Sequence, residues 1–259
     1  MAVSLWSLIL IAGRIYFAIQ SSCVDGLGSP ATIEQFPGVV QIENRVVLFW
    51  LQQCAGSVLT SYHILTAATC VTDGSGTALL TTRRVRAGAT SRGTGGVVKE
   101  LREVTVQPSY GTLGQDGDLA IIRVESAFVL GPTIQQVAIL GEGIELPAGL
   151  EVELVGWGAT TQGDSSSDEL HSVQLTAVYY GTCLNKYFGR ETITENMLCA
   201  GLTANSGRDL DGRDAGAPFF YSATLVGVVS FGVASGNDTY PVVATATGSY
   251  TSWIVETAT

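Results

Sequence analysis

The chain has 259 residues, 46% of them apolar, which is enough for one large all-β domain or two small domains with a substantial core. Thirteen Lys and Arg residues stand against 23 Asp and Glu, for a formal net charge of −10. A chain this acidic repels nucleic acid phosphates and anionic membranes, so neither is expected as a partner.

The first 22 residues have the pattern of a secretory signal peptide. An apolar run spans Leu5 to Ala12, and Ser21 or Ser22 offers a small residue for cleavage. Arg14 keeps the run well short of the roughly 20 apolar residues that a membrane anchor needs. We therefore predict a secreted, extracellular protein whose mature chain is residues 23–259.

Runs of β-branched and aromatic residues with Gly-rich breaks between them follow the signal. They cover residues 38–43, 45–53, 55–67, 151–158, 172–180 and 224–233. This spacing predicts an all-β sandwich or barrel. Helices are expected only at 182–189 and 249–257, and a polar surface loop at 161–169. Arg83, Arg84 and Arg86 are expected to form a solvated strand face.

The five cysteines also fit an oxidising compartment. Four of them form two equally spaced pairs, Cys54 with Cys70 and Cys183 with Cys199. A disulfide that closes a loop of this size contributes about 3 kcal/mol. Cys23 has no evident partner, and is free, paired between chains or removed with the signal. No C-x-x-C pair occurs, so we expect no metal and no cofactor.

Three motifs carry a family resemblance. They are "CAGSVLTSYHILTAATC" at 54–70, "GDLAIIRV" at 117–124 and "DGRDAGAP" at 211–218. "VGWGAT", "MLCAG", "VVSFG" and "SYTSWI" follow as further landmarks in matching order. From Asp25 to the C-terminus the chain resembles the trypsin and chymotrypsin family of serine proteases, most closely the trypsin-like proteins of insects. The resemblance implies that residues 23–259 form one domain, with two antiparallel six-stranded β-barrels, a cleft between them and a short C-terminal helix.

The catalytic chemistry of that family is not preserved in the matching residues. Serine endopeptidases need a hydroxyl nucleophile, a base to take its proton and a carboxylate to orient the base. The matching positions are Ala215, Thr69 and Asp118, so only the carboxylate is kept. Neither alanine nor threonine can replace the missing groups. His63 and His171, the only histidines, match no catalytic position and are expected at the surface or in packing.

The resemblance also implies a damaged oxyanion hole and specificity pocket. Arg213 replaces a glycine that supplies one N–H donor to the oxyanion hole. The pocket positions fall on Asp209, Ser230, Gly232 and Val242. Asp209 would suit a basic side chain, or is simply a solvated loop carboxylate. Val242 stands in place of a glycine and should obstruct a long side chain.

Activation is expected to be lost as well. Val24 removes the basic cleavage position, and Asp25 replaces the isoleucine whose freed amine would pair with Asp214. A second carboxylate beside Asp214 would be disfavoured by like-charge repulsion and desolvation. We therefore predict a permanently zymogen-like arrangement, or a pairing of Asp214 with Arg208 or Arg213.

Two further features concern the loops around the pocket. Asp211 and Ser235 stand where the family has a disulfide, so these loops are less restrained. Asn237 begins an Asn-Asp-Thr glycosylation acceptor at the pocket rim, and a glycan there would hinder access further.

The sequence thus predicts a secreted, inactive serine protease homologue, expected to be a monomer. It would act by binding an extracellular protease, zymogen or inhibitor, as a regulator, cofactor or decoy. Two alternatives stay open. One is a trypsin-like hydrolase that has residual activity or uses unconventional residues. The other is a structural or bulk secreted protein.

Overall fold

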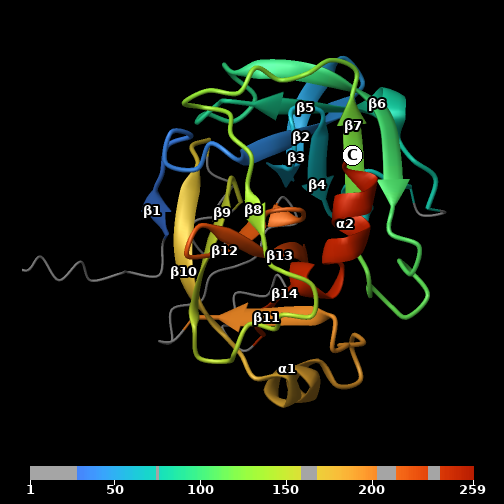
Figure 1. Cartoon of the computed structure of the whole chain (residues 1–259), viewed down its shortest axis with the longest axis vertical. Coiled ribbons are helices and arrows are strands. Elements are labelled where there is room, and N and C mark those ends of the chain that lie inside the picture. Colours follow the sequence, from blue (N-terminus) through green and yellow to red (C-terminus); the bar gives the residue numbers. More distant parts are fainter. Residues whose placement is uncertain (1–27, 74–75, 159–167, 203–213, 233–239) are drawn as a thin grey trace, which may run out of the picture.

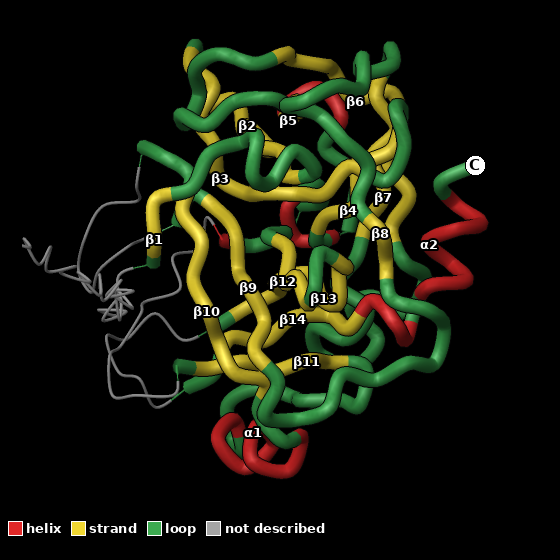
Figure 2. Tube along the Cα trace, turned by 60° about the vertical axis from the view of Figure 1, so that its left-hand side comes forward, coloured by secondary structure: helices red, strands yellow, loops and turns green. Residues whose placement is uncertain are grey.

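The computed structural model describes residues 28–73, 76–158, 168–202, 214–232 and 240–259 (Figures 1 and 2). The predicted signal peptide, Cys23, Val24 and Asp25 lie outside these residues, as does most of the predicted polar loop, at 161–167. The same holds for Arg208, Asp209, Asp211, Arg213, Ser235 and Asn237. The predictions made for these positions therefore remain predictions.

The first half of the chain forms a closed antiparallel barrel. Its strands pair in the order β2-β3-β4-β7-β6-β5, and Figure 1 shows them in the upper half of the molecule. Their bounds are β2 Val39–Val46, β3 Phe49–Val58, β4 His63–Thr66, β5 Arg83–Ala87, β6 Val97–Val106 and β7 Ala120–Val124.

The second half forms another six-stranded barrel. The bounds are β9 Glu151–Gly156, β10 His171–Ala177, β11 Met197–Gly201, β12 Pro218–Tyr221, β13 Thr224–Phe231 and β14 Val242–Ala246. Antiparallel pairing runs β9-β10-β11-β14-β13-β12 and returns to β9, which closes the ring. Two short strands attach to it, β1 Ser29–Pro30 on β10 and β8 Ala138–Ile139 on β13. The predicted pair of six-stranded barrels is confirmed.

Strand β10 shows why this sequence forms barrel walls. Val173, Leu175 and Ala177 are buried and face the core, whereas Gln174 between them is exposed. This alternation is the period of two that strand geometry imposes. Val, Ile, Leu, Ala and aromatic residues supply the other inward faces, including the fully buried Phe219.

The helices are few and short, as expected. α1 spans Tyr180–Tyr187 inside the second cysteine loop, and α2 spans Thr251–Thr257 near the C-terminus. The structure also has the 3₁₀ turns η1 Ala68–Cys70, η2 Leu80–Thr82 and η4 Thr247–Ser249. Within the described residues, no helix has the length and apolar character needed to cross a membrane.

Both predicted disulfides are present. Cys54 on β3 is bonded to Cys70 in η1, and Cys183 in α1 is bonded to Cys199 on β11. The first bond fixes η1 against the wall of the N-terminal barrel. The second fixes α1 against the C-terminal barrel.

The two barrels are joined by hydrogen bonds across a seam. Ala55 N–H donates to Ala215 O over 2.9 Å, and the Trp157 indole donates to Thr90 O over 2.7 Å. Gly216 lies against β3 at this seam, with φ of +78°. A Cβ added there would lie 2.1 Å from Ala55 O. Only glycine fits both this space and this backbone conformation.

The expectation for the arginine cluster was wrong. Arg84 and Arg86 form ion pairs of 2.5 and 2.6 Å with Glu43, whose side chain is fully buried. The guanidinium of Arg84 also lies 4.4 Å from the centre of the Trp50 ring. The reason is the register of β2 and β5, which places Glu43 directly opposite Arg84. These side chains are half-buried structural groups, not a solvated face.

Candidate active site

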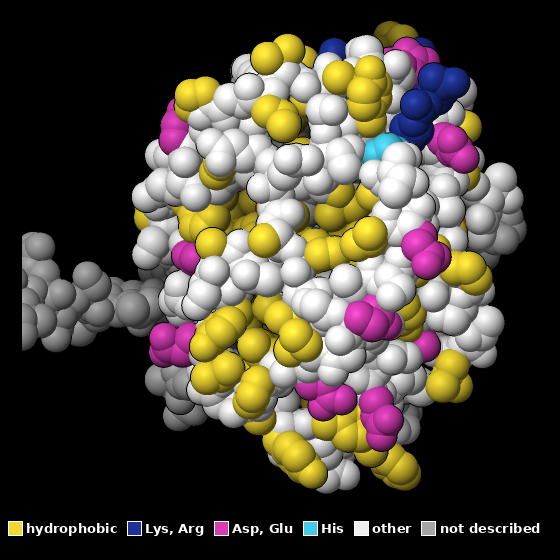
Figure 3. All heavy atoms as spheres, viewed as in Figure 1, with side chains coloured by type: hydrophobic (Ala, Val, Ile, Leu, Met, Phe, Trp, Pro, Cys, Tyr) yellow, Lys and Arg dark blue, Asp and Glu magenta, His cyan; other side chains and the backbone are white. Residues whose placement is uncertain are grey.

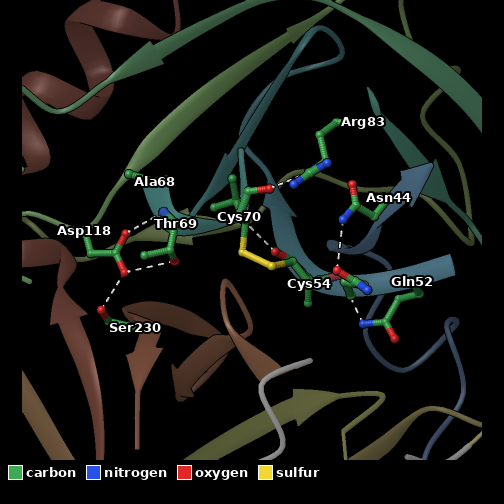
Figure 4. Close-up of a disulfide and its surroundings, with 12 residues drawn as sticks. Asn44, Gln52, Cys54, Ala68, Thr69, Cys70, Arg83, Asp118 and Ser230 are labelled. Atoms are coloured by element: carbon green, nitrogen blue, oxygen red, sulfur yellow. Dashed lines mark hydrogen bonds between the residues drawn. A yellow bond between two sulfur atoms is a disulfide. The ribbon is translucent and has the colours of Figure 1, made fainter. Parts of the chain in front are cut away.

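Asp118 lies at the junction of the two barrels, just before β7. Its side chain is fully buried and accepts hydrogen bonds from both halves of the molecule (Figure 4). The N–H of Thr69 donates to it over 2.9 Å and the Thr69 hydroxyl over 3.3 Å. Ser230 on β13 donates its hydroxyl over 2.5 Å. Thr69 comes from η1, so the carboxylate links the first disulfide loop to the C-terminal barrel.

Burial raises the pKa of Asp118 above its ordinary value. Hydrogen bonds from Ser230, Thr69 and the backbone of Ala68 oppose the shift without cancelling it. Asp118 is thus a buried carboxylate with donors from both barrels, and no imidazole contacts it among the described residues.

This shift predicts how Asp118→Asn affects stability. The pKa of Asp118 is higher in the folded state than in the unfolded state, where it is near 3.8. Its contribution to stability is therefore fully present below pH 3.8 and is lost as the pH rises through the folded-state pKa. Asparagine keeps the shape without the charge and can still bond to the Ser230 hydroxyl. We expect Asp118→Asn to be at least as stable as the wild type at pH 7, with the difference shrinking toward pH 4.

Urea unfolding between pH 4 and pH 8 measures this, with the exposed Glu34→Gln as the control. A constant deficit of Asp118→Asn at every pH would show that the hydrogen bonds outweigh the cost of burying the charge.

Ala215, the residue at the position of the family's nucleophile, lies close to Thr69. Ala215 and Thr69 line one pocket of about 220 Å³, here called the cleft pocket. Asn44, Gln53, Arg83 and the Cys54–Cys70 disulfide complete most of its wall. The structure therefore brings together the three residues Thr69, Asp118 and Ala215, as the resemblance implied.

The histidines lie elsewhere. His63 is buried on β4, where its ring contacts the Thr60 hydroxyl at 2.8 Å and burial lowers its pKa. It is a packing residue, and the surface alternative is wrong. His171 lies on β10, where its Nδ1 contacts Glu169 O at 2.9 Å. Neither ring lines the cleft pocket.

The predicted pocket residues have different surroundings. Ser230 is directed to Asp118, a role that the sequence analysis missed because the two residues are 112 positions apart. Val242 is half-buried on β14 and pairs with Ala200 on β11. Gly232 follows β13 and is also half-buried.

Asp214 is fully buried beside Ala215. Its carboxylate packs against the backbone of the β9 end, where a Cβ on Gly158 would lie 2.0 Å from it. Gly156 also lies close, so glycine at both positions makes room for this side chain. The predicted pairing of Asp214 with Arg208 or Arg213 concerns residues outside the described part of the chain.

The arrangement offers binding groups but no proton relay within the described residues. Thr69 donates to Asp118 and cannot act as a base at neutral pH. Ala215 has no nucleophilic atom. What lines the cleft pocket instead is a guanidinium and two amide side chains, from Arg83, Asn44 and Gln53.

Comparison with known sequences gives a consistent result. The family model described as Trypsin matches residues 26–254. The chain is 36% identical over 230 residues to "Trypsin, alkaline C" of Manduca sexta, covering 88% of each chain. It is 34% identical over 229 residues to "Trypsin CFT-1" of Choristoneura fumiferana, again covering 88% of each.

Among solved structures, the chain is similar to two scabies mite inactivated protease paralogues. Paralogue S-D1 has a TM-score of 0.77 and 25% identity, with 90% of this chain and 96% of that chain covered. Paralogue S-I1 has a TM-score of 0.77 and 26% identity, with 89% and 98% covered.

Proposed function

The chain belongs to the trypsin family, and from that premise we propose that it is a secreted, non-catalytic member that acts by binding another extracellular protein. The observation that carries the proposal is the contact between Thr69 and Asp118. A threonine hydroxyl occupies the place on the carboxylate that the base would need, and Ala215 faces the same pocket.

The magnitudes favour binding over catalysis. Loss of the triad in a serine protease costs about 10⁶ in rate. The remaining acceleration, about 10³ to 10⁴ over water, depends on the oxyanion hole and on substrate binding. In this chain Arg213 and Val242 alter both of those contributions. Because insect trypsins are among the relatives of this chain, hydrolysis is the alternative function.

The structure that remains supports a role for the folded surface. Both disulfides, both closed barrels and the hydrogen-bonded seam are in place. Such a rigid scaffold can present loops and cavities to a partner at a small entropic cost. A protease, a zymogen or a protease inhibitor is the proposed partner class, with the chain acting as regulator, cofactor or decoy.

The test uses the mature protein as bait in the secreted fluid of its source. The proposal expects a one-to-one complex with a protease, zymogen or inhibitor. The purified partner should then change its proteolytic rate, or its inhibition, when the chain is added. Cleavage of added peptides by the pure chain would favour the hydrolase alternative. A folded bait without any such complex would favour the bulk-protein alternative.

A further inference from the structure

A cavity of about 680 Å³ lies on the C-terminal barrel and shares no lining residue with the cleft pocket. It is formed where the connection 140–148 passes over the start of α1, β11 and the end of β14. We call it the acidic cavity. Its volume is within the usual range for ligand sites, about 300–1,000 Å³.

Two carboxylates and two aromatic rings dominate the chemistry of this cavity. Glu145 and Glu195 line it and are exposed, and Tyr179 and Tyr180 are beside them. The remaining wall is largely apolar, with Leu146 and Met197 among its residues. No Lys or Arg of the described chain lines it. Carboxylates beside tyrosine rings favour a cation, because both the charge and the ring faces attract it.

One of the two rings, that of Tyr180, is anchored by a hydrogen bond before any ligand arrives. The Tyr180 hydroxyl donates to Ile193 O over 3.3 Å. The Tyr179 ring lies over Gly181, where an added Cβ would meet it at 2.9 Å. A ring anchored as Tyr180 is loses little freedom on binding, which lowers the entropic cost of its contact.

The charge of the wider surface agrees with a cationic occupant. Beyond residue 125 the described chain has ten Asp and Glu residues but only Lys186 and Arg190 as bases. Between residues 28 and 125 the described acids and bases are equal in number, at eight each. On the face in Figure 3, basic side chains lie only near the top, whereas acidic ones occur over the whole face and are the only charged type in its lower half. This asymmetry would steer a basic segment toward the C-terminal barrel.

We propose that the acidic cavity is the docking site for a basic segment of the protein partner. Arg or Lys side chains of that segment would contact the carboxylates of Glu145 and Glu195 and the rings of Tyr179 and Tyr180. The inference rests on the proposed function, and it places the partner's main contact away from the cleft pocket.

The probe is the tripeptide acetyl-Arg-Phe-Arg-amide, compared with its citrulline analogue, which has nearly the same shape without charge. Calorimetry with the mature protein at 50 mM salt should detect the arginine peptide and not the analogue. Glu145→Gln with Glu195→Gln should weaken binding at least tenfold. The matched pair Glu34→Gln with Glu256→Gln removes the same charge elsewhere and should change it less than twofold.

Tyr179 provides a second, charge-independent test. Tyr179→Ala should weaken the peptide severalfold, whereas Tyr179→Phe keeps the ring and should not. If both pairs of glutamate variants weakened peptide binding equally, the overall charge of the protein would explain the effect and the proposal would be overturned. So would failure of the wild type to bind the arginine peptide at millimolar concentration.

The partner complex separates this proposal from the one before it. A complex that survives Glu145→Gln with Glu195→Gln would refute the docking site and leave the binding function intact. Binding of the arginine peptide to a chain that captures no partner would refute the binding function and leave the cation site intact.

Discussion

A chain carrying Thr69→His and Ala215→Ser together should hydrolyse an activated ester about 10² to 10³ times more slowly than the same chain with Arg213→Gly added. The cleft pocket lies beside both restored positions, and Asp118 is in place behind position 69. The family resemblance puts Arg213 where an oxyanion donor is needed. Loss of one such donor costs about 10² to 10³ in rate.

An acetyl-alanyl thioester is the appropriate substrate, because its small side chain avoids the position occupied by Val242. The ratio of the two variants is the measured quantity, since both share the changed activation sequence. Asp118→Asn added to the faster variant should lower its rate by about 10⁴, which shows that the restored triad is responsible. Equal rates for the double and triple variants would mean that Arg213 does not disturb the oxyanion hole.

Gly216→Ala should destabilise the fold by at least about 2 kcal/mol. Alanine in the left-handed conformation costs about 1–2 kcal/mol by itself. Its Cβ would in addition lie 2.1 Å from Ala55 O and 2.4 Å from the Thr66 hydroxyl. Ala55 O is backbone and also accepts the Thr66 hydroxyl, so the seam between the barrels must move apart.

Gly111→Ala is the matched control for the conformational part of this cost. Gly111 has φ of +79°, and nothing lies within 4 Å of its added Cβ. Urea unfolding of both variants isolates the effect of the clash as the difference between them. If the two variants lose the same stability, the close approach at the seam is not a constraint on the fold.

The barrels could be predicted from sequence because their signals are local or ordered along the chain. Alternating strands such as β10, the short helical segments and the equally spaced cysteine pairs each carry their own pattern. Seven ordered landmarks then fixed the family. The position of the three residues at the candidate active site followed from that order.

Contacts between distant segments could not be predicted in the same way. The bond from Ser230 to Asp118 depends on closure of both barrels. The pairing of Glu43 with Arg84 and Arg86 depends on the register of β2 and β5. A shift of one residue would place these side chains on opposite faces of the sheet. The acidic cavity draws its wall from several segments between residues 140 and 249, and no single segment shows its charge or shape.

Asp118 connects the two barrels at the candidate active site. In an active relative its carboxylate would orient a base, whereas here it accepts bonds from Thr69 and Ser230 across the seam. It therefore links the two barrels through hydrogen bonds, although the fold does not require its charge, since Asp118→Asn is expected to be at least as stable at pH 7.

The most direct test of non-catalytic function is peptide cleavage by the mature wild-type chain, followed by mass spectrometry over a diverse peptide library. We predict cleavage no faster than in buffer, with the same result for Asp118→Asn. Saturable cleavage by the wild type that Asp118→Asn abolishes would contradict the account, because it would show that Asp118 still serves a working catalytic site.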